Sequence, residues 1–351
     1  MRVLITGGCG FIGSAVIRHL IRATDHTIVN VDVMTYAASE DALEEALDSN
    51  RHTLVRADIA DAAAMKAAFE THQPDAVMHL AAESHVDRSI DGPADFMRTN
   101  IMGTFSLLEA ARAYYAGLTG ERRAAFRFHH VSTDEVFGAL EANDPPFVET
   151  TPYDPRSPYS SSKAASDHLV RAWFHTYGLP AFVSNTTNNY GIWQFPEKLI
   201  PLVLLNALEG KPLPVYGDGS NTRDWLFVED HAVALVRVLE QGVPGETYCI
   251  GARQPRTNLD VVHAICAELD RRLPDPDGPR SRLIRFVTDR PGHDFRYEID
   301  PSLAEKAIDW TAEHDFERGL ARTIDWYLSH REWWEAIRGG RYTGQRLGTA
   351  A

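Results

Sequence analysis

The chain has 351 residues, 44% of them hydrophobic, which is enough to bury one large core or two adjoining cores. Its formal net charge of -14 argues against binding to nucleic-acid backbones, which attract a concentrated positive surface. Cys9, Cys249 and Cys266 lie far apart without paired spacing or neighbouring histidines, so neither a disulfide framework nor a metal site is expected. With no leader before the first strand and no apolar stretch long enough to cross a bilayer, a cytoplasmic protein is expected.

The N-terminal half alternates short β-branched runs with helical stretches. Strands are expected at 3–5, 27–31, 53–55, 76–80 and 126–131, and helices at 11–23, 62–72 and 94–116. Because parallel strands need crossover connections, this alternation predicts a doubly wound parallel sheet of the Rossmann type, with helices on both faces. The alternation weakens after about residue 185. We therefore expect an NAD-binding domain over 1–185, with a returning segment near 222–254, and a smaller mixed α/β substrate domain over 186–351.

A glycine-rich turn follows the first expected strand. Gly7, Gly10 and Gly13 suit a tight turn, a close approach of backbone to pyrophosphate, and close packing of helix on strand. An ordinary strand-to-helix turn is the alternative, but Asp32 ends the second strand about 20 residues later, as in dinucleotide sites. Its carboxylate can accept bonds from both adenosine ribose hydroxyls and repels a 2′-phosphate, which favours NAD over NADP. Later strand ends add candidates for the adenine and the nicotinamide ribose: Asp58, Ile59, Leu80, Ala81 and Ala82.

A further helix, expected from Ser157 to Tyr177, carries Tyr159 and Lys163 four residues apart. This spacing places the phenol and the ammonium on one helical face. A phenol with a pKa of about 10 is a poor base at neutral pH, but the ammonium and a positive nicotinamide ring both favour phenolate. Tyr159 can then take a hydroxyl proton. An exposed helical pair is the simpler explanation of this short pattern alone, and the upstream glycine turn favours the catalytic one.

The fifth strand ends in Thr133, Asp134 and Glu135, which places a hydroxyl and two carboxyl groups at the edge of the sheet where ligands bind. Simple dehydrogenation does not need two acids. Elimination of water does, because one group removes a carbon-bound proton and the other protonates the departing hydroxyl. The alternative is a helix cap followed by solvated carboxylates.

The chain resembles the extended short-chain dehydrogenase/reductase family, and within it the sugar-nucleotide 4,6-dehydratases, over nearly its whole length. The similar segments are residues 6–14, 79–89, 132–138, 188–191, 194–201, 221–225 and 289–294. The Thr-Asp-Glu triplet separates these dehydratases from the sugar epimerases of the family. Cys9 stands where alanine is usual, and Ile192-Trp193 replaces a proline-led pair, which leaves the choice between thymidine and uridine open.

The resemblance implies an NAD-dependent hydro-lyase acting on a nucleoside-diphosphate-glucose, with dTDP-glucose as the expected substrate. Tyr159 would deprotonate the sugar 4-hydroxyl while hydride passes from C4 to NAD, and Thr133 would hydrogen-bond the same oxygen. Glu135 would then remove the C5 proton, and Asp134 would protonate the 6-hydroxyl as water leaves. Return of the hydride to C6 gives the 4-keto-6-deoxy sugar and regenerates a tightly bound NAD.

The resemblance also extends the two binding sites. Further cofactor-binding residues are expected at Phe11, Ile12, Thr35, Thr99, Tyr159, Lys163 and Asn189. Substrate-binding residues are expected at Ser84, Thr133, Asn188, Lys198, Leu199, Pro214, Tyr216, Arg223, Asn258, Arg290 and His293. Among these, Lys198, Arg223 and Arg290 suit the diphosphate. Tyr216 can pack on the base.

Helices 94–116 and 157–177 carry apolar residues on more than one face, which implies a second surface of burial. With the four-helix contact of the family, this predicts a homodimer of twofold symmetry. Two other functions stay open. A sugar-nucleotide 4-epimerase would share the cofactor site but has no use for an acid and base pair, and a catalytically silent NAD-binding regulator would need none of the reacting groups.

Overall fold

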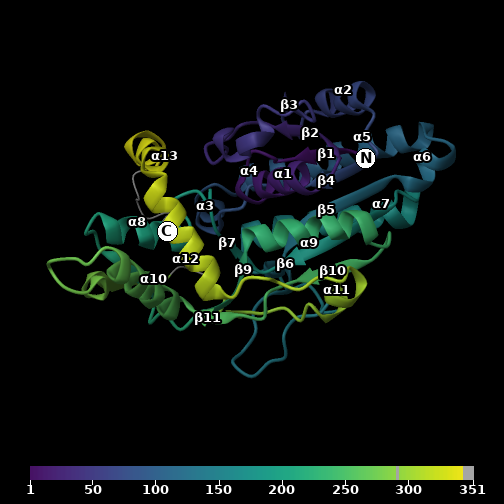
Figure 1. The fold of residues 1–351 in the computed structure, drawn as a ribbon. Coiled ribbons are helices and arrows are strands. Elements are labelled where there is room, and N and C mark those ends of the chain that lie inside the picture. Colours follow the sequence, from purple (N-terminus) through teal and green to yellow (C-terminus); the bar gives the residue numbers. More distant parts are fainter. Residues whose placement is uncertain (290–291, 343–351) are drawn as a thin grey trace.

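The computed structural model describes residues 1–289 and 292–342, and its largest element is a seven-stranded sheet (Figure 1). All neighbouring strands in this sheet are parallel. Their spatial order is β10 (Thr247–Ile250), β6 (Ala181–Thr186), β5 (Arg127–Thr133), β4 (Ala76–His79), β1 (Arg2–Thr6), β2 (Thr27–Asp32) and β3 (His52–Arg56). The order reverses at β1, where the chain turns from one half of the sheet to the other. This confirms the doubly wound parallel sheet.

Helices cover both faces of this sheet, each over its own apolar core. One face carries α1 (Phe11–Ala23) and α9 (Val228–Gln241). The other carries α2 (Ala62–His72), α5 (Thr104–Gly117) and α7 (Pro158–Tyr177). Shorter helices connect them: α3 (Val86–Asp91), α4 (Pro93–Phe96) and α6 (Gly120–Ala125).

The helix expected at 94–116 is present but interrupted, because a π-helical turn (Met97–Gly103) joins α4 to α5. Asn100 lies in this turn, where its side chain accepts a bond from Glu83 N and donates to Glu83 O, both at 2.9 Å. A π-helical turn often marks a functional position in a helix. Here it ties the helix to the loop that follows β4.

Local sequence fixes the ends of the helix that carries Tyr159. Ser157 and Ser160 form a reciprocal capping box, and Pro158 occupies the first turn, where its missing N–H costs nothing. The helix ends at Gly178, whose φ of 67° is favourable for glycine. Tyr159 and Lys163 therefore lie within the first two turns of a well-defined helix.

The C-terminal part has its own core of aromatic and aliphatic side chains. Its small sheets are formed by β7 (Asn188–Tyr190), β8 (Leu213–Tyr216), β9 (Thr222–Phe227), β11 (Pro255–Thr257), β12 (Ile284–Val287) and β13 (Arg296–Tyr297). Its helices are α8 (Leu199–Leu208), α10 (Asn258–Arg272), α12 (Phe316–Ser329) and α13 (Arg331–Ala336), and α10, α12 and α13 lie far from the N-terminus in Figure 1. The helix α11 (Ser302–Ala307) instead packs with the core of the large sheet through Ala304.

The unusual pair Ile192-Trp193 is buried in this second core. Trp193 has a φ of 64°, which is rare for a large side chain, and its indole N–H donates to Glu44 Oε1 at 2.7 Å. Glu44 lies in the segment between β2 and β3, whereas Trp193 belongs to the C-terminal part of the chain. This bond therefore joins the N-terminal part to the C-terminal part. In the described part of the chain, no helix combines the length and apolar character needed to span a membrane.

Candidate active site

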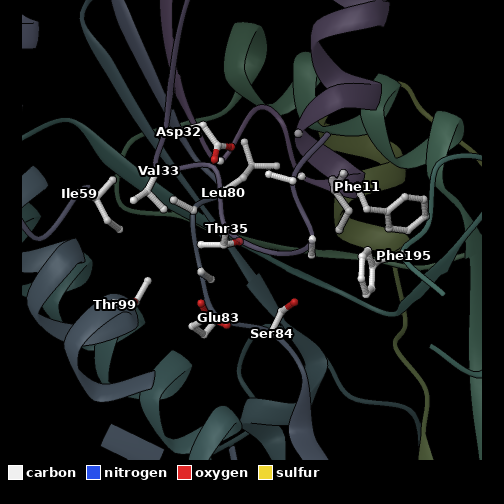
Figure 2. Close-up of a pocket in the computed structure, with 18 of the residues that line it drawn as sticks. Phe11, Asp32, Val33, Thr35, Ile59, Leu80, Glu83, Ser84, Thr99 and Phe195 are labelled. Carbon is white, nitrogen blue, oxygen red and sulfur yellow. The ribbon is translucent and has the colours of Figure 1, made fainter. Parts of the chain in front are cut away.

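A cavity of about 370 Å³ lies at the carboxyl ends of the parallel strands, where doubly wound folds bind ligands. Figure 2 shows Asp32 at one end of it, Glu83 and Ser84 at the other, and Phe11 and Phe195 together along one side. Its lining includes every expected cofactor residue except Asn189: Gly7, Gly10, Phe11, Ile12, Gly13, Asp32, Thr35, Asp58, Ile59, Leu80, Ala81, Ala82, Thr99, Tyr159 and Lys163. Asn189 lies on β7, where its amide donates to Thr187 O at 3.0 Å.

The glycine-rich turn is shaped so that larger residues do not fit. A Cβ on Gly13 would lie 2.1 Å from Gly7 O, and a Cβ on Gly7 would lie 2.7 Å from Ala81 Cα. Gly7 also has a φ of 73°. Gly10 caps α1 without any side-chain hydrogen bond, so the first backbone amides of that helix are available to an anion. This arrangement fits a pyrophosphate.

Asp32 lies beside this turn and is 7% exposed. Its Oδ2 accepts a bond from Cys9 N at 2.9 Å, and its Oδ1 accepts one from Met34 N at 2.8 Å. Burial raises the pKa of this carboxyl, and the two backbone bonds act in the opposite direction. The carboxylate keeps further lone pairs for the hydroxyls of a ribose. Its position and chemistry fit the adenosine end of NAD.

Tyr159 and Lys163 are both buried on the face of α7 that meets β5. The Lys163 ammonium donates to Val131 O at 2.9 Å. Burial lowers the pKa of Lys163 to about 8, and the charge of Asp167 opposes this shift. Lys163 is therefore charged at neutral pH but close to losing its proton.

Burial, and next the negative charge of Glu135, raise the pKa of the Tyr159 phenol. The ammonium of Lys163, which is expected to favour the phenolate, is bonded to a backbone carbonyl of β5. The expected phenolate, which also depends on the positive nicotinamide ring, stays a prediction.

The Thr-Asp-Glu triplet begins a 3₁₀ turn (Asp134–Phe137) directly after β5. Thr133 caps this turn, since its Oγ1 accepts a bond from Glu135 N at 3.3 Å. The cap explains Thr133 in part, but the carboxylates are not solvated: Asp134 is 1% exposed and Glu135 is half-buried.

The environment of Asp134 favours its neutral form. Burial and then the charge of Glu135 raise its pKa well above the usual range. Its Oδ2 has no hydrogen-bond partner among the described residues, and both acidic groups act on the ionisation of Tyr159. Two carboxyl groups and a phenol thus influence one another's ionisation at the end of β5. Tyr159 lines the cavity, whereas Asp134 and Glu135 are not among its lining residues.

The expected substrate residues fall into two groups. Ser84 and Lys198 line the cavity, and the Lys198 ammonium donates to Ser84 O at 2.9 Å. Outside it, Tyr216 contacts the ring of His293, and its hydroxyl donates to Asp87 Oδ2 at 3.4 Å. Because Ser84 lies just before α3 and Asp87 lies in its first turn, the segment that follows β4 joins the two groups.

Arg223 is 5% exposed and lies with its guanidinium 4.2 Å from the centre of the Tyr297 ring. It donates to Thr222 O at 2.7 Å and to Asp294 O at 2.9 Å. Asn188 lies on β7 with an Oδ1 that has no hydrogen-bond partner among the described residues. The other expected residues are at the start of α8, on β8 and at the start of α10: Leu199, Pro214 and Asn258. Arg290 lies outside the described residues.

The cavity also has lining residues that the sequence did not single out, among them Tyr36, Arg98, Phe195 and Glu197. Glu197 accepts bonds from Tyr36 OH at 2.7 Å and from Arg88 Nε at 2.9 Å, although the three come from different parts of the chain. Arg98 pairs with Asp58 beside the expected adenine site. Glu197 lies within residues 194–201, one of the segments that carry the resemblance. That position was the one sequence feature that could have marked it as a site residue.

The fold and the cavity define a dinucleotide-dependent enzyme of the short-chain dehydrogenase/reductase class, with two further carboxyl groups at the end of β5. The family model described as GDP-mannose 4,6 dehydratase matches residues 4–323. The chain therefore belongs to this family.

Individual relatives agree with this assignment. The chain is 55% identical to a dTDP-glucose 4,6-dehydratase of Escherichia coli over 99% of both chains. Among solved structures, it is similar to the dTDP-glucose 4,6-dehydratase DesIV of Streptomyces venezuelae with NAD bound, at a TM-score of 0.87 and 39% identity over 96% of this chain and 100% of that one. The enzyme of the same name from Bacillus anthracis, also in complex with NAD, has a TM-score of 0.85 and 38% identity over 96% and 99%.

Proposed function

We propose that this protein is an NAD-dependent hydro-lyase that converts dTDP-glucose into dTDP-4-keto-6-deoxy-glucose. The observation that carries the proposal is the convergence of buried Asp134, half-buried Glu135 and buried Tyr159 at the end of β5. The curated relatives at 55% identity bear the name of this activity. An epimerase has no use for the acid and base, and a silent NAD-binding protein needs none of the three groups.

The glycine turn, Asp32 and the strand ends would hold NAD. Gly10 and the first amides of α1 would bind its pyrophosphate, and Asp32 would accept bonds from the adenosine ribose. Asp58, Ile59 and Thr99 would flank the adenine, and Leu80 to Ala82 would pass along the nicotinamide ribose. When bound, NAD supplies an acceptor for hydride from C4 and a donor of hydride to C6.

Tyr159 and Thr133 act at the sugar 4-hydroxyl. Tyr159 takes the proton of this hydroxyl once it is a phenolate, and the charged Lys163 beside it favours that state. Thr133 would hydrogen-bond the same oxygen through its hydroxyl, which in the structure donates to Asp134 Oδ1 at 3.3 Å. Loss of hydride from C4 leaves a ketone, which makes the neighbouring C5 proton acidic.

Glu135 and Asp134 then eliminate water across C5 and C6. Glu135 removes the C5 proton, for which its half-buried carboxylate is suited. Asp134 gives its proton to the 6-hydroxyl as the C–O bond breaks. Burial raises the pKa of Asp134, which favours the protonated form that an acid needs.

The remaining substrate contacts come from the C-terminal part. Lys198 and Arg223, with Arg290, neutralise the diphosphate, and Tyr216 packs on the base. We propose that these residues, with Asn188, Leu199, Pro214, Asn258 and His293, belong to a substrate domain over 186–351. The returning segment near 222–254, which includes α9 and β10, would belong to the NAD-binding domain of 1–185.

The proposal includes a cytoplasmic homodimer. Phe105 on α5 is 38% exposed although its ring contacts Trp173 on α7, and Tyr177 beside Trp173 is 49% exposed. Burial of this aromatic surface against the same surface of a second copy would form a four-helix contact. Light scattering after size-exclusion chromatography tests this, and a monomer at all concentrations would contradict it.

Incubation of the NAD-loaded protein with dTDP-glucose and, separately, UDP-glucose tests the function. We expect a 4-keto product, detected by its absorbance in alkali, with the higher kcat/KM for dTDP-glucose. Conversion without loss of water would identify an epimerase instead. No turnover of either sugar would favour the binding protein, and equal turnover of both would remove the preference for thymidine.

A further inference from the structure

A buried carboxylate, Asp167, lies beneath the catalytic residues of α7 and is 0% exposed. Its Oδ1 is bonded to His130 Nε2 at 3.1 Å. Its Oδ2 accepts bonds from Ser132 Oγ at 2.8 Å, Tyr153 OH at 2.8 Å and Asn185 Nδ2 at 3.3 Å. A buried charge is costly unless it is bonded on all sides, and this one is. The bonds connect α7 with β5, β6 and the loop before α7.

These bonds end on the segments that carry the reacting groups. Ser132 directly precedes the Thr133-Asp134-Glu135 segment, and Asn185 donates a second bond to Thr133 O at 3.0 Å. On α7, Asp167 lies one turn after Lys163 and two turns after Tyr159. Lys163 itself is bonded to Val131 O. Lys163 and Asp167, which lie one turn apart on α7, are therefore both bonded to the end of β5.

We propose that Asp167 is a positioning residue of the dehydratase: it fixes the Thr133-Asp134-Glu135 segment against α7 and holds the charge of Lys163. The kinetic part of this inference rests on the function proposed above. The positioning part does not, because the order of the segment can be measured without substrate.

The charges around Asp167 support its role in holding the charge of Lys163. Burial lowers the pKa of Lys163 to about 8, and the negative charge of Asp167 works against that shift. For Asp167 itself, burial raises the pKa, but the bonds and charges of His130, Lys163 and Ser132 outweigh this, so it is ionised. The other titratable groups packed around the pair are His79 from β4, His130 from β5, Tyr153 from the preceding loop, and Tyr159 and Arg171 from α7.

Most of these neighbours are uncharged at neutral pH. Burial lowers the pKa of His79 and brings that of His130 to about 4, and it raises the pKa of both tyrosines. Arg171 is cationic and bonds the hydroxyl of Tyr153 at 3.0 Å. Hence the charge that keeps the proton on Lys163 is that of Asp167.

Asp167→Asn tests both roles, because it keeps the size of the side chain and removes the charge. We expect kcat to fall at least tenfold with KM within about twofold, since displacement of reacting groups costs rate rather than affinity. We also expect the alkaline limb of the pH profile of kcat/KM to move down by about one unit, as Lys163 loses its opposing charge. Hydrogen exchange of the substrate-free protein should rise at residues 131–137.

Two variants separate charge from positioning if Asp167→Asn folds poorly. Tyr153→Phe and Ser132→Ala each remove one bond to Asp167 but keep its charge. They should raise exchange at 131–137 and leave the alkaline limb in place. Ser184→Ala is the matched control, because it removes a buried hydroxyl bonded to His129, on the other face of β5. It should leave exchange at 131–137 and the pH profile unchanged.

The outcomes are distinct from failure of the proposed function. If wild-type protein makes no 4-keto product, the function fails, and exchange in the three Asp167-network variants still decides the positioning role. An unmoved alkaline limb in Asp167→Asn, or exchange that rises equally throughout the chain, would overturn the proposal in favour of a general structural role. Unchanged exchange at 131–137 in every variant would overturn it as well.

Discussion

Replacement of Asp134 by asparagine should lower the activity of the protein. As the pH rises, it should also make the protein more stable relative to the wild type at the same pH. Asp134 has a pKa in the folded protein well above the 3.8 of an ordinary aspartate, because it is buried and lies beside Glu135. As the pH rises above about 4, the unfolded chain loses this proton first, since its pKa is the lower of the two. The free energy of unfolding then falls by about 1.4 kcal/mol per pH unit until the folded pKa is reached. Asparagine has no proton to lose.

The size of the effect on melting temperature follows from the length of the chain. An unfolding entropy of about 2.1 cal/mol/K per residue converts about 1.4 kcal/mol into about 2 °C for a chain of this length. The difference in Tm between Asp134→Asn and wild type should therefore become more positive by about 2 °C per pH unit from about pH 4 up to the folded pKa of Asp134. Calorimetry at saturating NAD measures it. At neutral pH, kcat should fall by about 10²- to 10⁴-fold, because the general acid is lost.

Asp224→Asn is the matched control for this measurement. Asp224 is also fully buried, and burial raises its pKa to about 6, but its oxygens accept bonds from Gln254 N at 2.7 Å and Ala252 N at 3.1 Å. Asp224→Asn should destabilise the protein, because these bonds are weakened or lost. The difference in Tm between Asp224→Asn and wild type should stop changing with pH above pH 6. A Tm difference for Asp134→Asn that stays constant from pH 4 upward would refute the raised pKa of Asp134 and with it the argument that burial suits this group to act as an acid.

Three further substitutions test individual groups. Glu135→Gln should still reduce the bound cofactor, seen as the absorbance of reduced nicotinamide, but release no 4-keto-6-deoxy product; normal product formation would exclude Glu135 as the base. Tyr159→Phe should slow cofactor reduction in a single turnover by about 10²- to 10⁴-fold, whereas an unchanged rate would assign the first proton transfer to another group. Gly13→Ala places a Cβ 2.1 Å from Gly7 O, so it should lower the free energy of unfolding by about 1–3 kcal/mol. The variant should also lose NAD on gel filtration, and retention of NAD would show that the turn does not bind the pyrophosphate.

The sequence predicted the large sheet well because its signals are local. The helices α1 and α2 begin and end at the expected residues, since each is framed by a glycine turn or an aspartate cap next to β-branched runs. The π-helical turn Met97–Gly103 could not be predicted in the same way, because it depends on bonds between Asn100 and the distant Glu83. The two- and three-residue strands β7, β11 and β13 exist through their pairing with β9, which no local pattern indicates.

The same distinction applies to the site. Residue types at strand ends were sufficient to select the cavity lining, because parallel strands bring their carboxyl ends to one edge. They were not sufficient for the pKa of Tyr159, which is raised by burial of the phenol and next by the charge of Glu135. Nor could they reveal Glu197, whose bonds to Tyr36 and Arg88 join three separate segments.

Burial acts on the acid and the base of the reaction with opposite consequences. It favours the neutral form of both Asp134 and Tyr159, which suits an acid but opposes a base. The two chemical steps should therefore depend on pH in opposite directions. Below pH 8, where Lys163 keeps its charge, cofactor reduction in Glu135→Gln should speed up as the pH rises, because more Tyr159 is ionised. Elimination in the wild type, measured by loss of the reduced cofactor in a single turnover, should slow as Asp134 loses its proton. If both rates rise together over this range, the assignment of acid and base to these two residues is wrong.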